Sequence, residues 1–283
     1  MKRTLLVVLA HPDDESFGPG GTLAKYAAEG VDVHICIATD GVAGSVEVGY
    51  EEAAKDLAEV RAHELEEAVA ILGGTLHQLH YRDSGMQGDP ANKHPDAFIN
   101  ADKHEAVGHI VRLIRRYKPQ VVITNDETGG YYHPDHIRCY EITTAAFHAA
   151  ADPNQYPELA LEPHRPQLLY YTALPRRRLK LFSWLLRLRG QDPTAVGRNK
   201  DIDLTQLGYP AENLHTTIDF TPYWNVKMRA SAAHASQGGS GMNGLLPTWL
   251  QKRLLTTDNF IRAYPPTPNG FRDDDLFNGY HKA

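Results

Sequence analysis

The stretch that decides the fold is LLVVLAHPDDESFGPGG, residues 5–21. It continues an apolar run, Thr4 to Ala10, and a short run of this kind predicts a strand buried on both faces. The run ends in a histidine, a proline and three consecutive acids, Asp13, Asp14 and Glu15. Adjacent like charges repel one another, and folding alone gives no reason for them, so we expect a counter-charge at this loop. A metal ion is the first candidate.

Strands and helices alternate through the first half of the chain. Three more segments are expected to be strands, and three segments rich in helix formers separate them. The expected strands are Val31 to Thr39, Thr75 to Tyr81 and Gln120 to Asn125, and the expected helices are Gly21 to Gly30, Glu51 to Leu72 and His104 to Tyr117. This alternation is typical of the α/β class, so we expect a Rossmann-like, mostly parallel sheet with helices on both faces.

The length of 283 residues fits one large α/β domain. The second half is less regular and richer in proline, with an expected strand at Gln167 to Thr172 and an expected helix near Tyr223 to Ala235. Neither a repeat nor a low-complexity linker separates the halves. We therefore expect a single domain over residues 1–283, in which a core of about residues 1–150 carries a C-terminal extension, residues 151–283, that caps it.

The composition argues against several classes of partner. The formal net charge is -6 and the chain has no long basic block, which argues against nucleic acid and for a small or neutral substrate. The first apolar run is too short for a signal peptide, and no run approaches the roughly 18 apolar residues of a membrane span. We expect a cytoplasmic protein.

Two loops carry the tripeptide His-Pro-Asp close after an expected strand. They are AHPDDE, residues 10–15, and GGYYHPDH, residues 129–136. Because ligands of open parallel sheets bind beyond the carboxyl ends of the strands, we expect both loops at one edge of the sheet. Together they supply two imidazoles, His11 and His136, and the carboxylate of Asp14. This donor set leaves positions open for water and substrate, which is typical of catalytic zinc, and it also suits Fe(II).

The remaining acids of the first loop suit proton transfer and support. A carboxylate beside a metal-activated water would accept its proton, and Asp13 is the candidate for this general base. Glu15 is expected either to orient a ligand or to cap the helix that follows.

Together these motifs resemble the PIG-L/LmbE-like family of zinc-dependent N-deacetylases. That family includes the deacetylases of N-acetylglucosaminyl-phosphatidylinositol and of the mycothiol and bacillithiol precursors. The similarity covers most of the chain: AHPDDE with GGTLA, an R-x-x-E pair at Arg61 and Glu64, YRDSGM at residues 81–86, GGYYHPDH, and K-x-x-A-x-x-x-H-x-S-Q at residues 227–237. The combination of AHPDDE with a later HPDH is specific, and the other pieces are supportive.

By matching position, the resemblance implies zinc ligands at His11, Asp14 and His136. It implies the general base at Asp13. It also makes His234, in the last of these motifs, a further candidate for the site.

The resemblance implies five more functional residues. His133 matches the residue that assists at the developing oxyanion and the leaving amine, and Tyr131 matches a mobile tyrosine near the same oxygen. The positions that align with substrate contacts in the mycothiol branch of the family are Arg61, Asp83 and Met86.

Some of these residues have structural alternatives. Arg61 is one helical turn from Glu64 and can pair with it instead of contacting substrate. His133 can simply cap the helix that follows it. The chain also departs from the family pattern, because Val42 stands where many members have an acid and residues 175–200 form a long insertion. These departures leave the identity of the substrate open.

The insertion begins with PRRRLKLFSWLLRLRG, residues 175–190. Apolar side chains flanked by arginines suit a membrane-surface helix, which would bring the enzyme to a lipid-linked amino sugar. However, the apolar residues wrap nearly all the way round the helical wheel, which favours a buried lid or a contact between subunits of a homo-oligomer.

The expected function is hydrolysis of the N-acetyl group of an N-acetylglucosamine-type conjugate, which releases acetate and a free amine. An amidase that cleaves a larger mycothiol S-conjugate is the alternative among hydrolases. A nucleotide-binding oxidoreductase is suggested by FGPGGTLA, residues 17–24, but Leu23 replaces the last glycine of G-x-G-x-x-G. A non-catalytic sugar-binding relative would require the loss of the base or a ligand, and all of these are present.

Overall fold

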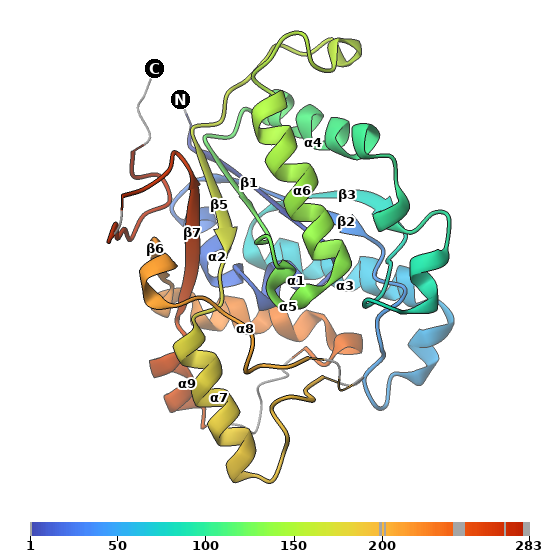
Figure 1. Ribbon diagram of the computed structural model, residues 1–283, viewed down its shortest axis with the longest axis vertical. Helices are drawn as coiled ribbons and strands as arrows, with labels where there is room; N and C mark the ends of the chain where they lie inside the picture. The colour runs from blue at the N-terminus through green and yellow to red at the C-terminus, as the bar shows by residue number, and fades with distance from the viewer. Residues whose placement is uncertain (1, 198–199, 201, 240–246, 269, 280–283) are drawn as a thin grey trace.

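Seven strands form one sheet in the part of the chain that the computed structural model describes, residues 2–197, 200, 202–239, 247–268 and 270–279 (Figure 1). The strands are β1 (Thr4–Leu9), β2 (Asp32–Thr39), β3 (Thr75–Tyr81), β4 (Val121–Thr124), β5 (Leu168–Thr172), β6 (Thr216–Asp219) and β7 (Thr257–Tyr264). Their order in the sheet is β3-β2-β1-β4-β5-β7-β6. Strands β1 to β5 pair in parallel, whereas β7 is antiparallel to both of its neighbours.

Helices cover both faces of this sheet (Figure 1). They are α1 (Asp14–Phe17), α2 (Gly20–Ala28), α3 (Leu57–Leu72), α4 (Lys103–Tyr117), α5 (Gly129–Tyr132), α6 (Pro134–Ala149), α7 (Arg176–Leu188), α8 (Trp224–Ala233) and α9 (Thr248–Leu254). Successive side chains of β1 point to opposite faces. Leu5 and Val7 pack with α2, α3 and α8, whereas Leu6 and Val8 pack with α4 and α6. The expected α/β class, with a mostly parallel sheet covered on both sides, is confirmed.

The local differences from the sequence expectations lie where the pattern is weak. The helix expected from residue 51 begins only at Leu57, because Glu51–Lys55 form a separate 3-10 turn and Asp56 has a non-helical φ of -133°. The alternation of apolar residues also did not reveal β6 and β7. Strand β6 has only four residues, and β7 mixes buried with half-buried positions.

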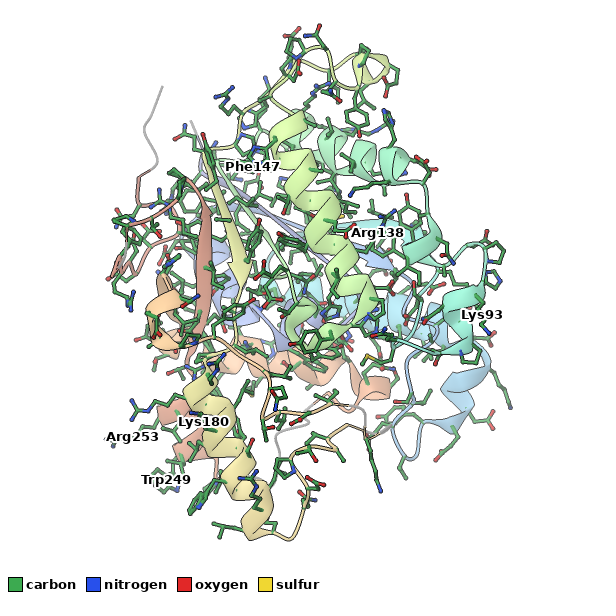
Figure 2. The ribbon with its side chains drawn as sticks, in the orientation of Figure 1. Lys93, Arg138, Phe147, Lys180, Trp249 and Arg253 are labelled. Atoms are coloured by element: carbon green, nitrogen blue, oxygen red, sulfur yellow. The ribbon has the colours of Figure 1, made fainter. Side chains whose placement is uncertain are left out.

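Helix α7 occupies Arg176–Leu188 of the insertion. Its buried side chains are Leu179, Ser183 and Leu186, and its exposed apolar ones are Leu181 (38%), Trp184 (55%) and Leu188 (65%). Figure 2 shows Lys180 of α7 and Trp249 and Arg253 of α9 at the same end of the molecule. Apolar residues of α7 thus face both the protein and the solvent, as the helical wheel indicated. The three interpretations of this helix, as a lid, a subunit contact or a membrane-surface helix, stay predictions. Among the described helices, none combines the length and the apolar character needed to cross a bilayer.

Candidate metal centre and active site

The two His-Pro-Asp loops meet at the carboxyl ends of β1 and β4, which are neighbours in the sheet. His11 Nδ1 is 3.1 Å from His136 Nε2. Asp14 Oδ2 lies 3.3 Å from His136 Nε2 and 3.7 Å from His11 Nδ1. The ligand atoms of a tetrahedral zinc site are about 3.3 Å apart, because each bond is about 2.0–2.1 Å long. The three ligands expected from the sequence therefore converge with the spacing that such a site needs.

The hydrogen-bond partner of His136 also fits a metal ligand. Asn125 Nδ2 lies 3.3 Å from His136 Nδ1, while Asn125 Oδ1 is buried without a hydrogen-bond partner. The two ends of an amide exchange by a half-turn of the side chain, and that turn lets Oδ1 accept a hydrogen bond from the Nδ1–H group. A proton on Nδ1 leaves the lone pair of Nε2 facing His11 and Asp14, as metal binding requires.

His11 is held from its other side by carboxylates. Its Nε2 lies 3.3 Å from Asp135 Oδ2 and 3.4 Å from Asp83 Oδ1. The backbone N–H of Ser84 donates to Asp135 Oδ2 at 2.9 Å and fixes that carboxylate. Burial lowers the pKa of His11, but the neighbouring carboxylates, Asp83 first among them, raise it well above its usual value. The carboxylates around His11 therefore stabilise a positive charge at this place, and a bound divalent cation would be stabilised in the same way.

Asp13 lies beside these ligands with an unusual backbone conformation. Its φ of 130° is rarely adopted by residues other than glycine, and such a conformation costs about 1–3 kcal/mol. The N–H of Asp13 donates to Glu15 Oε2 at 3.0 Å, and its Oδ2 accepts a hydrogen bond from Arg61 Nη2 at 3.0 Å. Burial raises the pKa of Asp13 to about 7, although Arg61 opposes the rise. A carboxylate with a pKa near 7 suits a general base.

A buried pair beneath this loop holds Glu15. His234 Nε2 is 2.7 Å from Glu15 Oε1, and both side chains are completely buried. Burial lowers the pKa of His234, but its hydrogen bond to Glu15 raises it above the usual value. Glu15 supports the backbone of Asp13, the N-cap residue of α1, at the helix start where the sequence analysis expected Glu15 to act as a cap. His234, which only the resemblance singled out, lies behind Glu15.

Arg61 is 2% exposed, and its guanidinium binds the loops around Asp13. It donates to the carbonyl of Gly41 at 2.7 Å, and a Cβ at Gly41 would lie 2.5 Å from Nη1 of Arg61. Glu64 instead accepts hydrogen bonds of 2.7 Å from the N–H and the hydroxyl of Ser236. The alternative pairing of Arg61 with Glu64 is therefore not observed among the described residues.

His133 and Tyr131 come from the irregular turn before α6. His133 caps α6, because its Nδ1 accepts a hydrogen bond from the N–H of Asp135 at 3.2 Å. This bond places the ring proton on Nε2, and burial together with His11 and His136 lowers the pKa of His133 to about 2. The ring of Tyr131 lies 5.1 Å from that of His136, and burial raises the pKa of its hydroxyl. Both residues are therefore neutral hydrogen-bond donors.

A cavity of about 790 Å³ opens beside this cluster. The residues that line its inner end are Asp14, Asn125, Tyr131 and His136. Cavities of roughly 300–1,000 Å³ hold drug-sized ligands. Two of the three convergent ligand residues, Asp14 and His136, thus border a space large enough for a substrate.

The three expected substrate contacts lie outside the lining of this cavity. Asp83 is 3% exposed and faces His11, and Met86 is half-buried in the following turn. Burial raises the pKa of Asp83, but His11 outweighs burial and holds the pKa well below its usual value. Neither these residues nor Arg61 belong to the described lining, so their contact with substrate stays a prediction.

Two residues that contact the expected ligands, Asp135 and Asn125, were missed by the sequence analysis. Asp135 is completely buried between two histidines of the motif and faces a third, His11. Its signal was available, because a histidine that binds a metal needs an acceptor for its second nitrogen. Asn125 gave no such signal, since it looked like the last residue of a strand.

Comparison with known proteins agrees with this chemistry. Residues 6–147 match the family model described as PIG-L, GlcNAc-PI de-N-acetylase. The chain belongs to the PIG-L family. A Rhodococcus erythropolis protein named 1D-myo-inositol 2-acetamido-2-deoxy-alpha-D-glucopyranoside deacetylase is 38% identical over 304 residues, which cover 99% of this chain and 98% of the relative. A Thermobifida fusca protein of the same name is 36% identical over 291 residues, covering 97% and 99%.

These relatives confirm the expected class, a metal-dependent N-deacetylase of the PIG-L family. The alternative prediction of an oxidoreductase rested on the loop FGPGGTLA after β1. The match to deacetylases over nearly the whole chain argues against that alternative.

Two solved structures share the fold. One is GalB, the 4-carboxy-2-hydroxymuconate hydratase of Pseudomonas putida KT2440, with a TM-score of 0.62 and 16% identity, covering 94% of this chain and 98% of that one. The other is the N,N'-diacetylchitobiose deacetylase of Pyrococcus horikoshii, with a TM-score of 0.58 and 21% identity, covering 89% and 73%. Since a hydratase and a deacetylase share this architecture, the side chains of the site must decide the reaction.

Proposed function

We propose that the protein removes the N-acetyl group from an N-acetylglucosamine conjugate and releases acetate and a free amine. The observation that carries this proposal is the convergence of His11, Asp14 and His136 beside the buried carboxylate of Asp13. Relatives that match nearly the whole chain are named for this reaction on an N-acetylglucosamine joined to inositol. That compound is therefore the first substrate to test, and the proposed place of action is the cytoplasm.

We assign the metal to His11 Nδ1, Asp14 and His136 Nε2, with zinc as the proposed ion and Fe(II) as the alternative. A divalent metal bound there would polarise the carbonyl of the scissile amide. Asp83 and Asp135 would keep the proton of His11 on Nε2, and Asn125 would keep the proton of His136 on Nδ1. These contacts leave both ligand nitrogens free to coordinate.

Asp13 acts as the proposed general base. It accepts a proton from the attacking water while the C–O bond forms at the acetyl carbon. The C–N bond then breaks, and the same proton passes to the departing nitrogen, so the products are acetate and the amine. Arg61 fixes the carboxylate of Asp13 for both transfers.

His133 and Tyr131 stabilise the oxyanion in this proposal. Both are neutral donors, Tyr131 in the lining of the cavity and His133 against the rings of His11 and His136, so they can donate hydrogen bonds without supplying a competing proton. Removal of one such donor lowers the rate by roughly 10²–10³-fold.

The test is a hydrolysis assay with protein loaded with zinc or with Fe(II). Candidate substrates are N-acetylglucosamine, its inositol glycoside and S-conjugates of an N-acetylated cysteinyl glucosamine, and the free amine is quantified. We expect amine from at least one N-acetylglucosamine compound, with acetate in equal amount. Amine without acetate, released from the S-conjugates alone, would assign the protein to the amidases instead.

A further inference from the structure

The cavity beside the metal ligands changes character along its length. Its inner end is polar and carries the reaction centre. Its outer part lies between the carboxyl end of β5, the amino end of β7 and the helices α7, α8 and α9. The apolar side chains of this outer part are Leu174, Leu179, Phe182, Trp224, Met228 and Leu255.

The charged residues in the wall of the outer part are already paired within the protein. Arg178 donates to the carbonyl of Thr257 at 2.9 Å and also to its hydroxyl. Lys227 donates to the carbonyl of Gly18 and lies 3.2 Å from Asp258 Oδ1. The other oxygen of Asp258 accepts hydrogen bonds from the N–H and the hydroxyl of Thr22, at 2.9 and 2.8 Å.

The lining also has a few uncharged polar side chains, among them Asn259, whose Nδ2 is buried without a hydrogen-bond partner, but most of the described lining surface is apolar. A group with many hydroxyls would find few partners on such a surface. A buried hydroxyl that loses water without gaining a partner is unfavourable, whereas buried methylene and aromatic groups gain free energy from leaving water. The volume of about 790 Å³ also leaves room beyond a single amino sugar placed at the reaction centre.

From these observations we infer that the outer cavity binds an apolar alkyl or aryl group that the amino sugar carries as its aglycone. This inference rests on the proposed N-deacetylase function and narrows its substrate class. It predicts a preference opposite to that implied by an inositol, whose ring carries only hydroxyl groups.

The first experiment compares glycosides of N-acetylglucosamine that differ only in the aglycone: methyl, butyl, hexyl, phenyl and inositol. Each methylene buried in an apolar site improves binding severalfold, so kcat/KM should rise on the order of tenfold or more from methyl to hexyl. The phenyl glycoside should also exceed the inositol glycoside. Equal kcat/KM across the alkyl series, or a preference for inositol, would overturn the inference and leave the proposed reaction standing.

Two neighbouring residues of α7 provide a matched pair of variants. Phe182 lines the cavity, whereas Leu181 is 38% exposed on the outer side of the helix. Phe182→Gln should reduce the ratio of kcat/KM for hexyl over methyl glycoside by about tenfold. Leu181→Gln should leave that ratio unchanged. An equal effect of both substitutions on the ratio would contradict the assignment of the cavity.

A binding measurement separates this inference from the reaction itself. Methyl and hexyl glucosides lack the acetamide and cannot be deacetylated, so titration calorimetry reports only their affinity. Hexyl glucoside should bind at least tenfold more tightly than methyl glucoside, and Phe182→Gln should remove most of the difference. If no N-acetyl compound is hydrolysed but this preference is found, the proposed function fails and the apolar cavity stands.

Discussion

Asp13 has a strained backbone and a buried carboxylate, and its carboxylate contacts the guanidinium of Arg61. Its pKa is raised to about 7 by burial, so the carboxylate can accept and return a proton near neutral pH. The arginine at 3.0 Å and the acid that binds its N–H both serve to fix its position. We therefore expect a substitution of Asp13 to affect the reaction rate strongly and metal binding little.

We expect Asp13→Asn to lower kcat by roughly 10²–10⁴-fold, because an amide cannot take the proton of the attacking water. The metal content, measured by elemental analysis, should stay at the level of the unmodified protein. His136→Ala is the complementary variant and should lose the metal, since it removes a ligand nitrogen. An Asp13→Asn protein with unchanged turnover would refute the assignment of the base.

A substitution of Glu15 tests whether this residue acts by holding Asp13 in position. Glu15→Gln weakens the bond to the N–H of Asp13 and leaves His234 without a charged partner, so kcat should fall while KM changes little. Because the pair is completely buried, the variant should also lose about 3–5 kcal/mol of unfolding free energy. In an Asp13→Asn background, Glu15→Gln should cause little further loss of kcat. Independent, multiplying losses would show that Glu15 does not act through Asp13.

The sequence was sufficient to name the candidate ligands and base, because each lies in a short motif at the end of an apolar run. It did not show which residues support them. Asp135 could have been inferred from its place between two histidines of the motif, but Asn125 and the contact between Glu15 and His234 depend on segments that only the folded chain brings together. A pattern in one dimension carries no signal for such a contact.

At the scale of elements, the approach of α2 to the strand-to-helix segment before α8 is set by one glycine. A Cβ at Gly21 would lie 2.2 Å from the ring of Phe220, which is completely buried. We expect Gly21→Ala to lower the unfolding free energy by about 1–3 kcal/mol or more, since ring and helix must separate.

The matched control for this substitution is Gly30→Ala, just after the end of the same helix. Gly30 has a φ of 80° and nothing within 4 Å of an added Cβ, so only backbone strain of about 1 kcal/mol applies. Urea unfolding of both variants measures the difference. Equal destabilisation would show that the contact between Gly21 and Phe220 does not limit the packing of α2.

Strands β1, β2 and β4 could be predicted because each is a largely apolar run, and β3 and β5 were also expected at nearly their observed positions. The last two could not, because β6 has only four residues and β7 mixes buried with half-buried positions, so neither forms a clear apolar pattern. The start of α3 was predicted six residues too early, at residue 51 and not at Leu57. Residues 51–55 favour helix locally, but Asp56 interrupts the backbone before the regular helix begins.

For the whole molecule, a bound metal is expected to stabilise the fold. Its proposed ligands come from loops after two different strands, and the unfolded chain does not hold them together. A metal at 100 times its Kd adds about 2.7 kcal/mol, which corresponds to a rise in Tm on the order of 5 °C. Calorimetry with zinc and with chelator measures this shift. The Tm of His136→Ala should not respond to zinc, and an unmodified protein equally insensitive would contradict the site.

Stability at acidic pH is expected to depend on a histidine pair far from the metal loops in sequence. His34 Nδ1 and His77 Nε2 are 3.0 Å apart on β2 and β3, and both rings pack against Tyr117. Burial, with smaller contributions from His34 and Arg116, lowers the pKa of His77 to about 4. An unfolded histidine titrates near 6.5, so the unfolded state binds the proton first and stability falls as pH drops from about 6.5 to about 4.

His77→Gln should reduce the dependence of the unfolding free energy on pH in that window. The control is His63→Gln, whose side chain is 88% exposed on α3 and should leave the slope unchanged. Urea unfolding at several pH values gives the slopes. Identical slopes for the two variants would contradict the assignment.

The two histidines that converge on the candidate metal centre are separated by 125 residues of chain. During synthesis, β1 to β3 with their helices emerge from the ribosome first, and they contain His11 and Asp14 but not the third partner. The proposed ligand set is therefore incomplete until α6 has emerged and β4 has docked beside β1. We therefore expect the proposed site to bind its cation only at a late stage of folding.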